Sequence, residues 1–251
     1  MDIVHEESKP ESDKNAQFPA TRWSLILTAK SGDATAAKRA VGELCRAYWY
    51  PIYSYVRRQG HSAQDAEDLT QEFFHSLIER NSLATADATR GRLRSFLLGA
   101  IKYQLINAHR REHAAKRGGG RVVFSIDQVQ AESRYSREPS HDQSPDVIFE
   151  RNWAQEILNA ASVQLQKWYE GSRRKDLFEA IRPFLDGRDL PGAYPAAAAS
   201  LGINESTLRV SISQMRKRYR ALIEDEISQT VSTPEEAAAE LNYLRLVLVG
   251  R

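Results

Sequence analysis

The chain has 251 residues, of which 41% are hydrophobic and 27% charged, and its formal net charge is only +2. These values are typical of a globular protein and allow one large domain or two small ones. No apolar run approaches the roughly 20 residues that a membrane helix needs, and the acidic start lacks the basic-then-apolar order of a secretory signal. Cys45 is the only cysteine, which excludes an intrachain disulfide and disfavours a cysteine-based zinc site. We therefore expect a cytoplasmic protein without membrane insertion.

Charge is unevenly distributed along the chain. Between residues 90 and 121, nine Lys or Arg stand against one acid, and residues 209 to 220 include five basic residues and no acid. Between residues 62 and 80, five acids stand against one base. Because charges farther apart than about 10 Å are screened from one another at moderate salt, the local excess matters more than the average. The pattern predicts a protein that contacts both a basic partner and a nucleic acid.

The first half of the chain predicts a helical domain, which we assign to residues 18–117. Residues 1–17 are polar, and we expect a disordered N-terminus there. Apolar residues recur at helical spacing from residue 22 to residue 59, which predicts two helices with a turn near residues 31–33 between them. Pro51 predicts a further kink or break. A third helix begins at Ser62, which forms a Ser-x-x-Asp capping box with Asp65. After a loop, a fourth helix is expected from about Ser95 to His113.

The second half predicts a linker and another helical domain. Residues 118–146 show little regular spacing, so we expect a flexible linker there, with 121–126 as the only candidate strand. Residues 147–232 begin with a long amphipathic helix, and further helices are expected over 175–184, 194–201 and 205–224. A tail helix is expected within residues 233–251. The predicted fold is therefore all-α, with two helical domains.

Residues 194–224 have the pattern of a helix-turn-helix. Gly202 stands where a tight turn needs a positive φ, and Asn204 is a good N-cap for the second helix. Short polar and cationic side chains follow, as in a helix whose start enters the major groove and whose later cations reach phosphates. The alternative is a surface hairpin with a solvated basic face, but the absence of acid from 209 to 220 favours DNA. The candidate DNA-binding residues are Ser206, Thr207, Arg209, Ser211, Ser213, Arg216, Lys217 and Arg218.

A second set of candidate DNA-binding residues lies between residues 90 and 111. Cations alternate in the loop before the fourth helix and continue along that helix, with aromatic residues between them. Single-stranded nucleic acids are bound in this way, because bases stack on rings while phosphates meet the charges. Phe96 is better explained as a core residue. The candidates are Arg90, Arg92, Arg94, Lys102, Tyr103, Asn107, Arg110 and Arg111.

The third helix carries an acidic face, with Asp65, Asp68 and Glu72 at positions i, i+3 and i+7. Like charges at this spacing repel by about 0.2–0.5 kcal/mol per pair, and a partner rich in Arg or Lys would offset that cost. A solvated helix face is the alternative.

The sequence contains no recognisable catalytic arrangement. His109 and His113 lack the glutamate of the His-Glu-x-x-His metal motif, and the glycines at 118–120 lack the Gly-Lys-Ser/Thr of a phosphate-binding loop. We therefore expect no enzymatic activity, no metal and no cofactor.

The segment Asp65-Ala-Glu-Asp-Leu-Thr-Gln-Glu-Phe-Phe74 resembles the extracytoplasmic-function group of sigma factors, whose second conserved domain carries Asp-Ala-Glu-Asp-Leu-x-Gln-Glu-x-Phe. The resemblance continues through Leu93-Arg94-Ser95-Phe96-Leu97, similar to the family's Phe-Arg-x-Trp-Leu, and through residues 107–111. Residues 194–203 and 206–209 are similar to the helix-turn-helix of the family's fourth domain. In all, the resemblance covers about residues 22–117 and 147–230. Phe96 replaces the usual tryptophan, and Pro195 replaces an acid at a position where proline is tolerated.

The resemblance implies a factor that binds core RNA polymerase, directs it to promoters and melts DNA. The acidic helix would bind the β′ clamp, and the fourth domain the β flap. The region around Ser95 would open and read the minus-ten box, the helix after Asn204 would read the minus-thirty-five box, and the linker would thread the polymerase cleft. An anti-sigma factor is a further partner of such proteins. The implied polymerase-binding residues are Asp65, Glu67, Asp68, Gln71, Glu72 and Phe73.

Two other hypotheses remain on the sequence alone. A free-standing helix-turn-helix regulator would bind duplex DNA tightly without polymerase, with a salt slope of about −4 to −5 if all five cations from 209 to 220 met phosphates. A nuclease ranks far below, because no set of metal-binding carboxylates lies near the basic segments.

Overall fold

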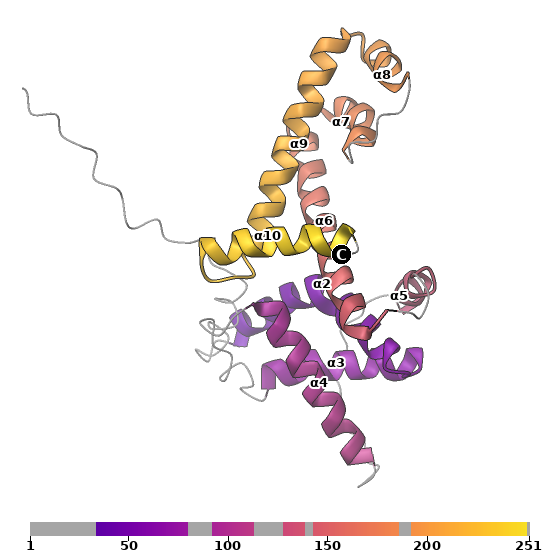
Figure 1. Cartoon of the computed structure of the whole chain (residues 1–251), viewed down its shortest axis with the longest axis vertical. Helices are drawn as coiled ribbons and strands as arrows, with labels where there is room; N and C mark the ends of the chain where they lie inside the picture. Colours follow the sequence, from indigo (N-terminus) through magenta and orange to yellow (C-terminus); the bar gives the residue numbers. More distant parts are fainter. Residues whose placement is uncertain (1–33, 80–91, 113–127, 139–142, 186–191, 250–251) are drawn as a thin grey trace, which may run out of the picture.

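The computed structural model describes residues 34–79, 92–112, 128–138, 143–185 and 192–249, and every regular element in these ranges is a helix (Figure 1). The prediction of an all-α fold is confirmed. None of the described helices is long and apolar enough to cross a membrane. The elements are α2 (Ala34–Arg58), α3 (Ala63–Glu79), α4 (Leu93–Glu112), α5 (Gln128–Tyr135), α6 (Pro145–Gly171), α7 (Lys175–Ile181), the 3₁₀ helix η3 (Arg182–Phe184), α8 (Ala193–Leu201), α9 (Glu205–Ser228) and α10 (Pro234–Val249).

Buried side chains form two hydrophobic cores. The first core joins α2, α3 and α4 to the N-terminal half of α6, and Trp153 and Phe74 are among its largest fully buried residues. The second core joins the C-terminal end of α6 to α7, α8 and the first half of α9, around Leu165 and Phe178. We call these parts the first and second lobes. The long helices α6 and α9 lie side by side and reach both cores, so the lobes are joined by continuous helix (Figure 1).

Helix α2 runs unbroken through Pro51, where the sequence predicts a kink or break. Proline removes one backbone donor and crowds the preceding turn. The residues that follow it, Ile52 and Tyr53, are fully buried, and Tyr53 stacks on Trp49 with ring centroids 5.0 Å apart. Burial on both sides of Pro51 therefore stabilises a helix that local propensity disfavours.

Helix α5 lies within the segment where the sequence predicts a flexible linker. It is held against α2, because Arg57 pairs with Glu132 at 2.7 Å and the Tyr53 hydroxyl donates to the same carboxylate at 2.5 Å. The Arg57 guanidinium also lies 4.6 Å from the centre of the Tyr135 ring. Among the described side chains of this helix, only Ala131 and Tyr135 pack on the first core, and polar contacts supply the rest of its attachment, so the spacing of apolar residues does not reveal it. The candidate strand at 121–126 lies outside the described residues, and the domain boundaries stay predictions.

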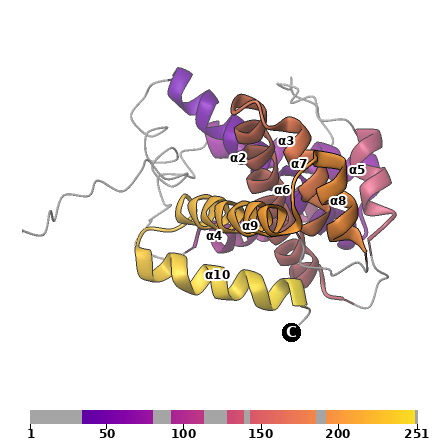
Figure 2. The same ribbon diagram turned by 90° about the horizontal axis from the view of Figure 1, so that it is seen from above.

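Helix α10 lies against α9 and α6, and its Leu244 is buried in the first core (Figures 1 and 2). Its start is encoded locally: the Thr233 hydroxyl accepts from the Glu236 amide at 3.2 Å, and the Glu236 carboxylate accepts from the Ser232 amide at 2.9 Å. A Thr-Pro-Glu-Glu sequence favours such a start, because proline suits the first helical position and glutamate the third. The predicted tail helix is thus present and begins at Pro234, as expected.

Candidate functional site

The acidic face of α3 is accessible in the structure. Ala66, Phe74 and Leu77 turn into the first core, which leaves the carboxylates on the opposite side. The helix begins as the sequence predicts, with the Asp65 amide donating to the Ser62 hydroxyl at 3.1 Å. Asp65 is exposed, and the other three acids are partly buried. We call the set Asp65, Glu67, Asp68 and Glu72 the acidic surface.

Two predicted members of this set lie at its base. Phe73 is 1% exposed and packs edge-on against Phe74, with ring centroids 5.2 Å apart, so it belongs to the core and not to the exposed face. Gln71 is 8% exposed, and its amide donates to the Glu67 carboxylate at 3.1 Å. Gln71 therefore orients an acid of the surface.

Helix α4 turns Leu93, Leu97 and Ile101 into the first core. Its outer side presents Tyr103, which is 70% exposed, and Ile106, which is 54% exposed. A ring as exposed as that of Tyr103 contributes little to the packing of the core, and it can stack on a flat ligand. Asn107 is partly buried.

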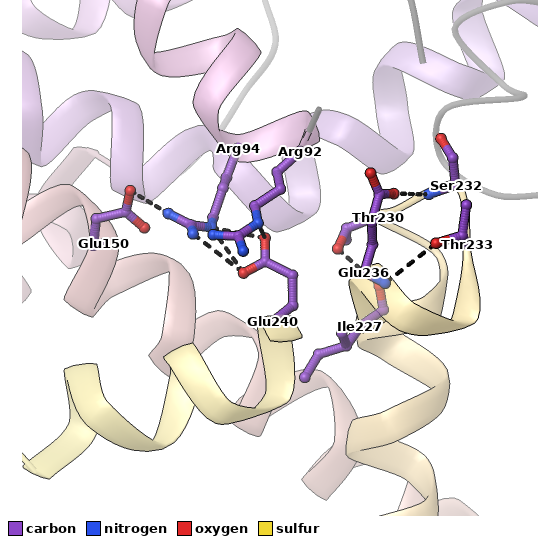
Figure 3. Close-up of polar contacts among 9 residues, drawn as sticks. All are labelled: Arg92, Arg94, Glu150, Ile227, Thr230, Ser232, Thr233, Glu236 and Glu240. Carbon is purple, nitrogen blue, oxygen red and sulfur yellow. Dashed lines mark hydrogen bonds and ion pairs between the residues drawn. The ribbon is translucent and has the colours of Figure 1, made fainter. Parts of the chain in front are cut away.

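The start of α4 is closed off, which is the main departure from the predicted DNA surface. Arg94 is 4% exposed and pairs with Glu240 of α10 at 2.9 Å and with Glu150 of α6 (Figure 3). Arg92 also faces Glu240, at 3.5 Å. In this arrangement the Arg94 side chain is bound within the protein and does not reach the surface. Burial raises the pKa of Glu150 above its usual range, and the charge of Arg94 opposes that shift.

Lys102 lies at the side of α4 and pairs with Asp146 at the start of α6, with 2.6 Å between Nζ and the carboxylate oxygen. The hydrogen bond to Asp146 raises the pKa of Lys102, while burial opposes this. The pair is 40% and 50% exposed, so a phosphate can compete for the ammonium. Arg90 and the side chains of Arg110 and Arg111 lie outside the described residues.

Helices α8 and α9 are joined by the tight turn that the sequence predicts. Gly202 adopts φ 64°, in the left-handed region, and Asn204 caps α9 by accepting from the Thr207 amide at 2.7 Å. Leu208 and Met215 are fully buried in the second core. This burial fixes which side of α9 faces outward, and it exposes Ser206, Thr207 and Ser213. Ser211 is half-buried and donates to the Thr207 carbonyl at 3.1 Å.

The cations of α9 are held in different ways. Arg209 donates to Glu205 at 2.6 Å and lies 4.3 Å from the centre of the Tyr194 ring. Arg216 donates to the carbonyl of Phe184 at 2.7 and 2.9 Å, which satisfies the end of η3. On the opposite side, Arg218 stacks over Trp168 at 3.6 Å.

A pocket of about 380 Å³ opens between α8 and α9, and four cations surround it. Lys217 and Arg220 are exposed there, beside Arg209 and Arg216. Its lining also includes Tyr194 and Ser213. A concave basic surface of this kind suits a phosphate backbone, whose negative charge is the main source of affinity in nucleic-acid binding.

Sequence reasoning missed the partners of Arg92 and Arg94. Glu240 has one usable signal: it shares a helical face with Leu244 and Val247, at spacings i, i+4 and i+7, and an acid on an apolar face needs a buried cation. The sequence does not identify that cation, because Arg94 lies 146 residues away.

Burial raises the pKa of the Cys45 thiol to about 12, so the only cysteine is no nucleophile at neutral pH.

Residues 44–115 match the family model described as Sigma-70 region 2. The match covers less than a third of the chain but contains all of α3 and α4, together with the acidic surface and the candidate DNA-binding residues between 90 and 111. The match supports a relation of this segment to the sigma-70 family. Neither the curated proteins nor the solved structures contain a match to this chain.

Proposed function

We propose that the chain is a sigma factor of the extracytoplasmic-function type, which acts in the cytoplasm, binds core RNA polymerase, and recognises and opens promoters. The observation that carries the proposal is the match to Sigma-70 region 2 over a segment whose α3 carries one exposed and three half-buried carboxylates on the side away from the core. We assign the acidic surface to the β′ clamp. Its like charges repel one another within one helix, and a basic partner would relieve that repulsion.

We assign the two basic surfaces to promoter DNA. On α4, exposed Tyr103 and the accessible ammonium of Lys102 suit the stacking and phosphate contacts of an opened strand. On α9, Ser206, Thr207 and Ser213 are exposed near the helix start, where a recognition helix reads bases. Lys217, beside the basic pocket, suits a phosphate contact that positions the protein without reading sequence.

Core-polymerase binding tests the first assignment. We expect the full chain to co-purify with core RNA polymerase and to direct specific run-off transcripts. Charge reversal at Asp68 or Glu72 should abolish co-purification, because a lysine would face the basic partner with a like charge. The measurement is the fraction of polymerase retained on tagged protein, with the helical content of each variant checked by circular dichroism.

The matched control is Glu179→Lys, which makes the same charge change at an exposed position of α7 and breaks only the weak surface pair with Lys175, at 3.6 Å. It should retain polymerase binding. Undiminished binding by both Asp68→Lys and Glu72→Lys would refute the assignment. Tight, salt-sensitive binding to duplex DNA by a chain that never binds polymerase would favour the free-standing regulator instead.

A further inference from the structure

Arg94 lies in a closed cluster built from three parts of the chain. Its guanidinium contacts both oxygens of Glu240, at 2.9 and 3.3 Å from Nε, and also pairs with Glu150 (Figure 3). The rings of Tyr243 and Trp153 lie 4.1 and 4.9 Å from it. Glu240 is only 1% exposed. The α10 carboxylate is therefore fully withdrawn from water and committed to this contact.

The charges of the cluster balance one another. Arg92 and Arg94 face Glu150 and Glu240, so the start of α4 carries no net positive charge in this arrangement. Burial lowers the pKa of Arg94, but the Glu240 hydrogen bonds and the charges of both acids outweigh it and raise that pKa, so the guanidinium stays ionised. A carboxylate that meets a guanidinium through two oxygens has the geometry of a phosphate contact. Glu240 thus occupies the position that a nucleic-acid phosphate would need.

The attachment of α10 has the features of a reversible contact. The helix has its own N-terminal cap at Thr233 and follows α9 after a short turn. One backbone hydrogen bond ties that turn to α4, from the Leu93 amide to the Thr230 carbonyl at 3.3 Å. Among its described side chains only Glu240 and Leu244 are fully buried, and Leu246 and Val249 are 51% and 71% exposed. The other apolar contacts of α10 with the first core come from half-buried side chains, namely Ala237, Leu241, Tyr243 and Val247. An element attached mainly through half-buried contacts opens at lower cost than the fully buried core.

We infer that α10 is an intramolecular cover that competes with single-stranded nucleic acid for the start of α4. In the closed state shown here, Glu240 shares the neutralisation of Arg92 and Arg94 with Glu150 of α6. Release of α10 removes one of these two acids and leaves a net positive charge at the start of α4 for an incoming strand. The inference rests on the proposed function for its biological meaning, since a covered α4 would keep the chain from promoter DNA until release. The competition itself is independent of that meaning.

The test compares two Glu→Gln variants of α10. Glu240→Gln keeps the shape of the side chain but removes its charge, whereas Glu235→Gln makes the same change at an exposed position in the first turn of α10. The full chain of each variant is titrated into a fluorescent single-stranded DNA of about 12 nucleotides, a length within the usual site sizes, and anisotropy is followed. Because apparent affinity scales with the open fraction, we expect about tenfold tighter binding by Glu240→Gln and less than about twofold change by Glu235→Gln.

A second measurement needs no variant. Amide hydrogen exchange over residues 234–249 of the wild-type chain should accelerate when the oligonucleotide is added, because the strand displaces α10. If Glu240→Gln lowers the melting temperature without tightening binding, or if bound oligonucleotide leaves α10 exchange unchanged, the cluster is merely structural and the inference is overturned. Co-purification with polymerase reports separately on the proposed function, since Glu240 pairs with Arg92 and Arg94 at the start of α4, whereas the acidic surface lies on α3.

Discussion

At the residue scale, Gly202 is the position where backbone conformation alone decides the structure. Its φ of 64° lies in the left-handed region, and a Cβ added there would meet nothing within 4 Å. The cost of a side chain is therefore backbone strain and not a clash. The turn between α8 and α9 depends on this conformation, because the Gly202 amide closes α8 by donating to the Ala199 carbonyl at 3.1 Å.

Gly202→Ala should lower the free energy of unfolding by about 1–2 kcal/mol, the usual penalty for a left-handed alanine. Gly99→Ala is the matched control, because Gly99 lies inside α4 with helical φ and open space around its Cα. There the same change should raise the free energy of unfolding by roughly 0.5–1 kcal/mol. Urea denaturation of both variants measures the two values. If both substitutions changed the free energy of unfolding in the same direction, the left-handed conformation of Gly202 would not be the source of strain.

Local rules predicted the residues whose partners are near in sequence. Ser62 and Asn204 cap their helices by accepting amides three positions ahead, and the sequence shows both. The environment of Arg94 could not be predicted in this way, because its partners come from α6 and α10. The local sequence around Arg94 is compatible both with an exposed cation and with a buried, ion-paired one. The position of Glu240 in the folded chain decides between these two cases.

At the element scale, α5 shows a helix that polar contacts dock onto the first lobe. Its Glu132 accepts from Arg57 and from the Tyr53 hydroxyl. The Arg57 hydrogen bonds are the main cause of a lowered pKa at Glu132, with Tyr53 adding to the effect and burial opposing it. Burial raises the pKa of Tyr53, the Glu132 carboxylate adds to this rise, and Arg57 opposes it. A charged glutamate is thus what fixes α5, which explains why apolar periodicity misses this helix within the predicted linker.

Acid should release α5 before it unfolds the first lobe. Because the folded-state pKa of Glu132 lies below the ordinary 4.5, the unfolded state binds the proton first. The stabilisation is therefore fully present above pH 4.5 and is lost as the pH falls below it towards the folded-state value. The protection of residues 128–135 against hydrogen exchange, taken relative to the intrinsic exchange rate at each pH, should fall over this interval in the wild-type chain.

Glu132→Gln is the variant that tests this dependence. It should exchange faster at neutral pH and show little further change on acidification, since the titrating group is gone. The control Glu179→Gln removes an exposed acid of α7 and should leave α5 exchange as in the wild type. An α5 whose exchange responds to acid equally in the wild type and in Glu132→Gln would contradict the assigned role of Glu132.

At the scale of the whole molecule, two long helices couple two cores. Ile157 of α6 is buried in the first core and Leu165 in the second, two turns apart. Between them α9 lies alongside, where the Tyr219 hydroxyl donates to the Leu158 carbonyl at 3.1 Å. The sequence predicts α6 as a helix of the second domain only, because periodicity identifies a buried face but not which core receives it. Shared helices predict that the lobes unfold together.

Asn159→Pro should uncouple the lobes. Asn159 is exposed in the middle of α6, so proline there removes no core contact, but it deletes a backbone hydrogen bond and clashes with the carbonyl of Gln155, at a cost of about 3 kcal/mol or more. The wild-type chain should melt in one calorimetric transition whose van't Hoff and calorimetric enthalpies agree. In Asn159→Pro the van't Hoff enthalpy should fall below the calorimetric value, because each lobe then melts by itself, whereas Asn159→Ala should keep the two equal. A proline variant that still melts in one cooperative step would mean that α9 alone suffices to hold the lobes together.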